Sequence, residues 1–169
     1  MVILVMGVTG SGKTTVGKLL AERQKWEFAD ADDFHSPENK AKMHQGIALT
    51  DADRAPWLAA IRDQIAKWLA EKKNAVMACS ALKRSYRDIL LSAAGNSAAS
   101  APEIQIIYLR GNYPLIAERL HTRAGHFAGE SILASQFADL EEPSDAIIID
   151  INHTPAEIVD EVIRRLHLA

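Results

Sequence analysis

The sequence is poor in the features that mark several classes of protein. Its 169 residues include one cysteine, Cys79, so no disulfide can form within the chain and a disulfide-stapled scaffold is excluded. The apolar run Met1–Met6 ends at a glycine, far short of the roughly 20 residues that a membrane span needs. No basic segment precedes this run and no cleavage site follows it, which argues against a secretory signal peptide. We therefore expect a cytoplasmic protein with no membrane partner.

An excess of charge of one sign is also missing. The chain has 19 Lys+Arg and 22 Asp+Glu, a formal net charge of −3, so there is no electrostatic case for a nucleic acid partner. Hydrophobic residues make up 48% of the chain, which supports a real core and excludes a disordered chain. The length fits one domain that spans residues 1–169.

Short apolar runs rich in β-branched residues recur along the chain. Unbroken runs of this length are typical of strands buried on both faces of a parallel sheet. They are Val2–Met6, Ala75–Cys79, Ile104–Leu109 and Ala146–Ile151, with a weaker candidate at Trp26–Ala29. Helical patterns fill the gaps between them, and strands that alternate with helices predict right-handed crossovers in a doubly wound α/β domain.

Three of these helical patterns are clear. Apolar residues at spacings of three and four predict helices over Thr14–Arg23 and Trp57–Leu69. A capping box, Thr154 to Glu157 with proline at the first helical position, predicts the start of the last helix. The small residues of Ser92–Pro102 predict a solvated loop before the strand at Ile104–Leu109.

A glycine-rich loop follows the first predicted strand and opens the first predicted helix. It fits the pattern G-x-x-x-x-G-K-[ST] at every fixed position. Such a loop turns backbone N–H groups towards a phosphate, its lysine reaches the β- and γ-phosphates, and its last hydroxyl is placed to ligate Mg²⁺. A glycine-rich turn with an incidental lysine would not require the strand and helix on either side. We expect a nucleoside triphosphate to bind at Gly7, Val8, Thr9, Gly10, Ser11, Gly12, Lys13 and Thr14.

Acidic residues follow the weak strand candidate. Asp30 and Asp32 lie beyond its carboxyl end, where ligands bind in open α/β sheets, and their alternation points both the same way if the strand extends that far. One could hold the water shell of Mg²⁺ while the other accepts the proton of an attacking hydroxyl. The alternative is that both acids only cap a helix or form a turn. His35 is either a substrate contact or a packing residue in a loop.

Basic residues lie away from the phosphate loop. Lys83, Arg84 and Arg87 follow a predicted strand and begin a helix, where the macrodipole disfavours cations. This conflict predicts a site that needs positive charge, such as one for an acidic sugar, and Arg54 adds a further cation. The alternative is that these are solvated side chains paired with nearby aspartates.

Two arginines follow the strand at Ile104–Leu109. Arg119 and Arg123 are four residues apart, so they project from one helical face. A guanidinium can stack on a purine or neutralise a phosphoryl group in transfer. The glycine-flanked segment 122–130 predicts a short lid that excludes water. The alternative is that both arginines are only solvated.

Several segments together resemble the gluconokinase family, in its order and with its spacing. They are the phosphate loop, Asp30–Met43, Leu49–Leu58, Cys79–Arg87, Gly125–Phe127, Gln136–Phe137 and Leu140–Pro143. The phosphate loop alone would be unspecific, but the middle segments are highly specific. The resemblance runs from the first strand to the last helix and leaves out only Ser92–Pro102.

This resemblance implies a phosphotransferase that uses ATP and Mg²⁺ to phosphorylate D-gluconate at its 6-hydroxyl. It implies a P-loop fold of the nucleoside-monophosphate-kinase type with a five-stranded parallel sheet flanked by helices, an acceptor-binding region at about 34–56, and a homodimer. The implied catalytic residues are Lys13, Asp30, Asp32 and Arg123. ATP is assigned to the phosphate loop with Thr15, Arg119 and Arg123, and the metal to Thr14 and Asp30. The acceptor is assigned to Asp32, His35, Arg54, Lys83, Arg84, Arg87 and His126.

Two rival hypotheses differ in what they require. A kinase on the same fold with another small acid as acceptor, such as shikimate, would release ADP in response to that acid instead. A nucleotide-dependent switch would hydrolyse slowly whatever acid is present.

Overall fold

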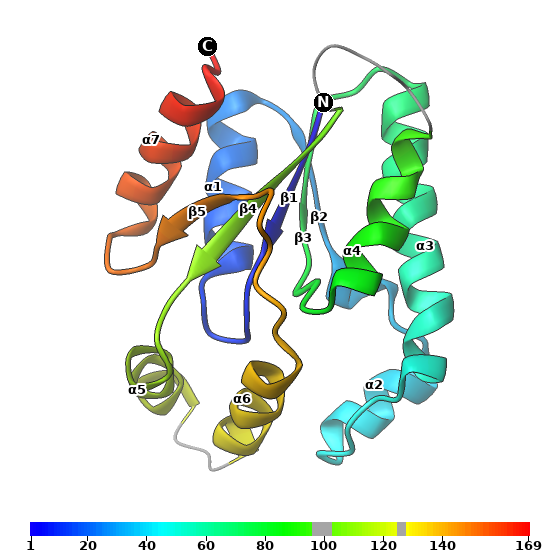
Figure 1. Cartoon of the computed structure of the whole chain (residues 1–169), viewed down its shortest axis with the longest axis vertical. Helices are drawn as coiled ribbons and strands as arrows, with labels where there is room; N and C mark the ends of the chain where they lie inside the picture. The colour runs from blue at the N-terminus through cyan, green and yellow to red at the C-terminus, as the bar shows by residue number, and fades with distance from the viewer. Residues whose placement is uncertain (96–102, 125–127) are drawn as a thin grey trace.

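A parallel sheet of five strands forms the middle of the molecule in the computed structural model (Figure 1). The structure describes residues 1–95, 103–124 and 128–169, and only the backbone of 123, 124 and 128–130. The strands are β1 (Val2–Met6), β2 (Glu27–Asp30), β3 (Ala75–Ala78), β4 (Ile104–Arg110) and β5 (Ile147–Asp150). Their order is β2-β3-β1-β4-β5, and every neighbouring pair is parallel. The predicted strands are confirmed, with small shifts at their ends.

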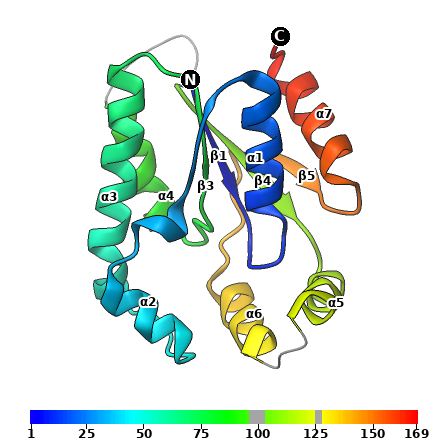
Figure 2. The ribbon, with the colours of Figure 1, turned by 180° about the vertical axis from the view of Figure 1, so that it is seen from behind.

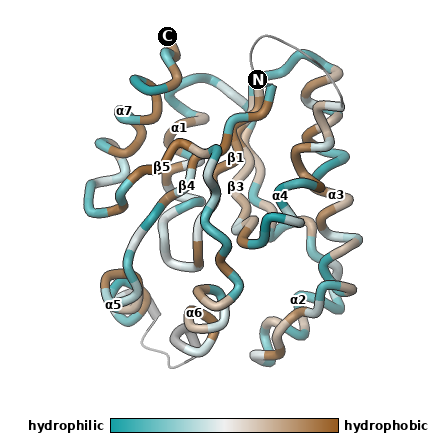
Figure 3. The backbone as a smooth tube through the Cα atoms, in the orientation of Figure 1, coloured by the Kyte–Doolittle hydropathy of each residue, from teal (hydrophilic) through white to brown (hydrophobic). Residues whose placement is uncertain are grey.

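Alternate residues of β1 face two separate layers of helices. Residues 2, 4 and 6 join the core with α3 (Asp51–Ala70) and α4 (Arg84–Leu91), whereas residues 3 and 5 join the core with α1 (Lys13–Gln24) and α7 (Pro155–Leu166). Figures 1 and 2 show these two helix pairs on opposite sides of the sheet. Figure 3 shows hydrophobic colour along the inner strands and mixed colour along the helices. The predicted doubly wound α/β fold is therefore confirmed.

The remaining helices gather where the strands end. Figure 1 shows α2 (Pro37–His44), α5 (Tyr113–Ala124) and α6 (Ala128–Asp139) beyond the carboxyl ends of the strands, with both chain termini at the opposite end. The strand order reverses at β1, because β3 lies on one side of it and β4 on the other. Ligands of open α/β sheets bind at such a reversal. This edge of the sheet is therefore the place to look for a functional site.

Three helices begin at capping residues that can be compared with the sequence predictions. The capping box of α7 is present as predicted. The helix α3 begins at Asp51 rather than at Trp57, because Thr50 and Asp53 form a second capping box and Pro56 is accommodated inside the helix. The helix α2 was not predicted, although Ser36 accepts a hydrogen bond from Asn39 N–H and Pro37 occupies its first turn.

The predicted loop at 92–102 is only partly described. Its first residues form a short 3₁₀ helix, Ser92–Ala94, and 96–102 lie outside the described residues. Among the described residues, no helix has the length and apolar character that a membrane crossing requires.

The capping box of α7 predicts a measurable loss of stability. Thr154 Oγ1 accepts a hydrogen bond from Glu157 N–H, and Thr154→Ala removes that acceptor. We expect the free energy of unfolding to fall by about 1 kcal/mol in urea denaturation. Thr154→Ser keeps the oxygen and serves as the control, which should unfold close to wild type. An alanine variant as stable as the serine variant would contradict the capping role.

Candidate active site

The loop between β1 and α1 is shaped to hold an anion. Gly12 precedes α1 with φ 95°, and no side chain of the described residues caps this helix, so its first N–H groups are open to a ligand. At Gly10, φ is 77° and a Cβ would lie 2.9 Å from Leu120 Cγ, so a side chain does not fit. Lys13 Nζ donates to the Val8 carbonyl at 2.9 Å, which closes the loop around its own lysine. The geometry agrees with the predicted phosphate loop.

The two predicted acids meet this loop. Thr14 Oγ1 donates to Asp30 Oδ2 at 2.6 Å, and Asp32 N–H donates to Asp30 Oδ1 at 3.0 Å. Strand alternation could align the two acids only if β2 reached Asp32, but β2 ends at Asp30 and a 3₁₀ helix, η1 (Ala31–Phe34), follows. The turn of η1 brings Asp32 back beside Asp30, and both acids line one pocket with Lys13.

Burial and neighbouring charges shift the pKa values of Lys13 and Asp32 in this pocket. Desolvation lowers the pKa of Lys13, whereas the nearby Asp32 carboxylate opposes that shift. Partial desolvation raises the pKa of Asp32, and the Asp30 carboxylate raises it further. A carboxylate with a raised pKa is a better proton acceptor than an ordinary one.

The single cysteine of the chain forms part of the same pocket wall. Cys79 is buried at the end of β3, and burial raises the pKa of its thiol to about 12. The side chain therefore stays protonated and contributes packing rather than charge.

Two pockets adjoin at the carboxyl edge of the sheet. The first, here called the phosphate pocket after its predicted ligand, is a cavity of about 200 Å³ lined by Gly10, Lys13, Thr14, Asp30 and Asp32 among others. The second, here the acceptor pocket, is a cavity of about 360 Å³ lined by His35, Arg54, Tyr86 and Asp139 among others. Asp32, Ser80 and Gln136 line both. A group held in one pocket can therefore reach a group held in the other.

His35 packs against a tryptophan and also lines the acceptor pocket, so its predicted contact with the substrate stays a prediction. Its ring stacks on Trp57, with centroids 4.3 Å apart and planes 10° apart, while Trp57 Nε1 donates to the Ala31 carbonyl at 2.7 Å. His35 also lines the acceptor pocket, and its buried Nδ1 has no hydrogen-bond partner among the described residues. Burial, Arg54 and Lys40 lower the pKa of His35, so the pocket contains a neutral imidazole.

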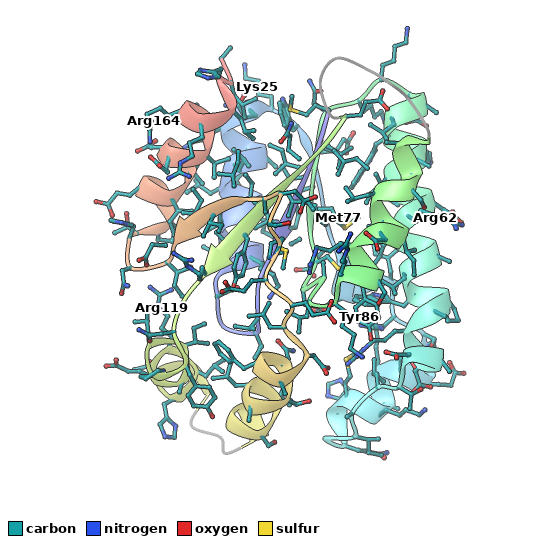
Figure 4. The ribbon with its side chains drawn as sticks, in the orientation of Figure 1. Lys25, Arg62, Met77, Tyr86, Arg119 and Arg164 are labelled. Atoms are coloured by element: carbon teal, nitrogen blue, oxygen red, sulfur yellow. The ribbon has the colours of Figure 1, made fainter. Side chains whose placement is uncertain are left out.

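Arg54 is the basic residue that the structure brings into the acceptor pocket. Its Nη1 donates to the Tyr86 hydroxyl at 2.9 Å and lies 3.8 Å from Asp139 Oδ2. The Tyr86 hydroxyl in turn donates to Asp51 through a short hydrogen bond. Figure 4 labels Tyr86 on α4, the helix that faces this side of the cleft. The guanidinium is thus held in position from α4 and α6.

The other basic residues of this region make contacts within the protein. Arg87 is buried, and its Nη1 donates to the Ala81 and Leu82 carbonyls at 2.9 Å each, so it supports the loop after β3. Lys83 pairs with Asp51 at 3.1 Å. The backbone N–H of Arg84 donates to Glu141 at 2.7 Å, which places a carboxylate at the start of α4. None of the three lines either pocket.

The arginines of α5 are described in part. Arg119, labelled on the left of the molecule in Figure 4, donates to the Ile151 carbonyl at 2.5 Å and so joins α5 to the end of β5. The side chain of Arg123, and all of His126, lie outside the described residues. Within the predicted lid 122–130, residues 122–124 end α5 and residues 128–130 begin α6, while 125–127 lie outside the described residues.

Comparison with known proteins agrees with this geometry. A family model described as shikimate kinase matches residues 9–167. A probable gluconokinase of Mus musculus is 42% identical, over 98% of this chain and 97% of that protein. A crystal structure of a gluconokinase from Sinorhizobium meliloti is 43% identical with a TM-score of 0.84, over 98% of this chain and 90% of that one. The chain belongs to the gluconokinase family.

This gluconokinase-family chain is accordingly a phosphotransferase with a P-loop kinase fold. The Mycobacterium tuberculosis APS kinase, solved with AMPPNP and APS, has a TM-score of 0.73 at 18% identity, over 98% of this chain and 96% of that one. At that identity it shows only that the fold is shared.

Several residues of the site were not assigned from the sequence. Tyr86, Asp139 and Gln136 line the acceptor pocket, and Gln136 also accepts a hydrogen bond from the phosphate loop. Gln136 lies in a segment that carries the resemblance to gluconokinases, but nothing in its local pattern indicates a partner 127 positions away.

The neutral state of His35 predicts a titration that NMR can follow. Because burial and two cations oppose its protonation, we expect the imidazole to titrate below the ordinary value of 6.5. A His35→Gln spectrum assigns the signal, and Lys40→Met removes one of the cations. The signal should move towards a higher pKa in Lys40→Met. Titration of wild-type His35 at or above 6.5 would contradict this description of the pocket.

Proposed function

We propose that the protein transfers the γ-phosphoryl group of ATP to the 6-hydroxyl of D-gluconate, forming 6-phospho-D-gluconate and ADP. The observation that carries the proposal is the junction at Asp32, where a phosphate pocket meets a pocket with a guanidinium. Relatives over nearly the whole chain, among them those named above, are described as gluconokinases. The junction supports phosphoryl transfer, and the relatives support gluconate as the acceptor.

The donor is ATP, held by its phosphates in the loop 7–14. Open N–H groups at the start of α1 bind the phosphate oxygens, and Lys13 offsets their charge. We assign Thr15 and Arg119 to this nucleotide site as well. Arg123 would add a further cation near the transferred group.

The residues near Asp30 fit Mg²⁺. Thr14 and Asp30 bring a hydroxyl and a carboxylate within 2.6 Å of each other, and these are the hard oxygen donors that Mg²⁺ prefers. No group of three or more His, Cys, Asp or Glu side chains that could hold a metal occurs among the described residues, which suits an ion held mainly by water and phosphate. When bound, Mg²⁺ neutralises charge on the β- and γ-phosphates.

Asp32 is the group we assign to the acceptor hydroxyl. It lines both pockets, and its raised pKa favours taking up a proton. Asp30 is committed to Thr14 and to the Asp32 backbone, which leaves Asp32 as the proton acceptor of the pair.

The opposite part of the acceptor pocket suits an acidic sugar. Arg54 is oriented by the Tyr86 hydroxyl, and a guanidinium binds a carboxylate by charge-assisted hydrogen bonds that a neutral sugar cannot make. The unpaired Nδ1 of neutral His35 is available to a sugar hydroxyl. His126, Lys83 and Arg84 remain proposed acceptor contacts, whereas Arg87 supports their loop. The family resemblance is the ground for proposing a cytoplasmic homodimer.

A second acceptor follows from one observation. The matching family model is described as shikimate kinase, so shikimate belongs in the test as a competing acid.

Release of ADP in the presence of acids tests the proposal. We expect gluconate, and not shikimate, to accelerate ADP release by wild type with MgATP. Lys13→Met should lower that rate by about 100-fold or more, because it removes a cation from the transferred group. Lys67→Met, on the exposed side of α3, is the matched control and should retain wild-type activity. A rate that ignores gluconate would refute the acceptor, and an active Lys13→Met would refute the mechanism.

The role of Asp32 predicts a pH dependence with a definite sign. The proton acceptor must be ionised, so the rate should be full above the pKa of Asp32 and should fall as the pH drops through it, at a value above 3.8. Asp32→Asn should lower turnover by about 10²- to 10⁴-fold and remove this acidic limb. Asp63→Asn, at an exposed position of α3 outside both pockets, is the control. An unchanged acidic limb in Asp32→Asn would exclude Asp32 as the proton acceptor.

A further inference from the structure

A glutamine from α6 reaches the phosphate loop. Gln136 Oε1 accepts a hydrogen bond from the backbone N–H of Thr9 at 2.6 Å, across 127 positions of sequence. Gln136 also lines both the phosphate pocket and the acceptor pocket. Figure 1 shows α6 beyond the end of the sheet, below the loop that joins β1 to α1. This side chain therefore lies at the boundary that a transferred group must cross.

The hydrogen bond fixes which way the amide faces. A backbone N–H can only donate, so the atom that meets Thr9 must be the amide oxygen. The amide nitrogen, with its two N–H donors, is then the group left for other contacts. Within residues 1–95, 103–124 and 128–169, Nε2 of Gln136 donates no hydrogen bond. The amide oxygen thus has a hydrogen-bond partner, whereas the amide nitrogen has none among these residues.

The helix that carries Gln136 is anchored to the core on both sides of it. Leu133 is fully buried in the core that includes β1 and α1. Just beyond α6, Glu141 N–H donates to the Leu82 carbonyl at 2.9 Å, and the Glu141 carboxylate accepts from Arg84 N–H. An amide on such a support holds its position with little reorganisation, which is what makes a hydrogen-bond donor effective in a transition state.

The boundary between the pockets needs such a donor. A phosphoryl group in transfer carries charge on three oxygens. Asp32, which also lines both pockets, brings a carboxylate to the same place and opposes that charge. Lys13 offsets the charge from the loop side, where its Nζ is held by the Val8 carbonyl. A neutral hydrogen-bond donor on the α6 side would stabilise the phosphoryl oxygens without burying a further charged group.

We propose that Gln136 is a catalytic residue whose Nε2 donates a hydrogen bond to a non-bridging oxygen of the phosphoryl group during transfer. In that step the acceptor hydroxyl oxygen forms a bond to the γ-phosphorus and the bond to the β–γ bridging oxygen breaks. The electron pair leaves with ADP, and the hydroxyl proton passes to Asp32. The inference rests on the proposed phosphoryl transfer but not on gluconate being the acceptor.

Two substitutions separate this role from a merely structural one. Gln136→Glu keeps an oxygen that accepts from Thr9 N–H but removes the donor, and Gln136→Met removes both. We expect kcat to fall by about 100-fold in each, as when an oxyanion donor is removed, with ADP affinity within about threefold of wild type in the uncharged variant Gln136→Met. Ala134→Glu places the same new charge on an exposed position of α6 outside both pockets, and it should keep wild-type kcat.

Binding of ADP with aluminium fluoride, a mimic of the transferred group, gives a readout that needs no acceptor. Both Gln136 variants should bind this complex more weakly than wild type, and Gln136→Met should still bind ADP normally. If Gln136→Glu or Gln136→Met keeps kcat within fivefold of wild type, or if the ADP affinity of Gln136→Met falls as much as its kcat, Gln136 only supports the loop and the proposal is wrong. If wild type ignores gluconate, the gluconokinase proposal fails alone, and the binding comparison still decides the role of Gln136.

Discussion

The arrangement depends on one constraint, which is that all five strands run in the same direction. Parallel strands deliver every carboxyl end to one edge, and the reversal of order at β1 opens that edge between two layers of helices. The phosphate loop after β1, the acids after β2 and the turn after β3 therefore meet, although they are far apart in sequence. The Thr14–Asp30 hydrogen bond is the direct sign of this meeting.

Electrostatics explain how the cations at the start of α4 are accommodated in the protein. Cations at the start of α4 looked misplaced against the helix dipole, but Asp51 pairs with Lys83 and the Glu141 carboxylate accepts from the first N–H group of α4. The charge conflict is thus resolved within the protein, before any substrate is considered. Arg54, by contrast, is oriented by a hydroxyl and a distant carboxylate, which leaves it able to exchange partners.

Features that depend only on residues close together in the sequence could be predicted. Buried strands, the capping box at Thr154 and the phosphate loop are local patterns, and each was predicted at its place. Contacts made through the fold were not readable: the stack of His35 on Trp57, the Tyr86 link to Arg54 and the reach of Gln136 to Thr9. The alternation of Asp30 and Asp32 was also no guide to the direction of their side chains, because a 3₁₀ helix and not a strand follows Asp30. The helix α2 was readable from Ser36 and Pro37 but was overlooked, since its short apolar pattern is weak.

The protonated state of Cys79 has a consequence for the chemistry that the site resists. A thiol attacks electrophiles and peroxides as its thiolate, and a pKa of about 12 leaves almost none of that form at neutral pH. The Cys79 thiol in the wall of the phosphate pocket is therefore a poor target for alkylating reagents and oxidants at neutral pH.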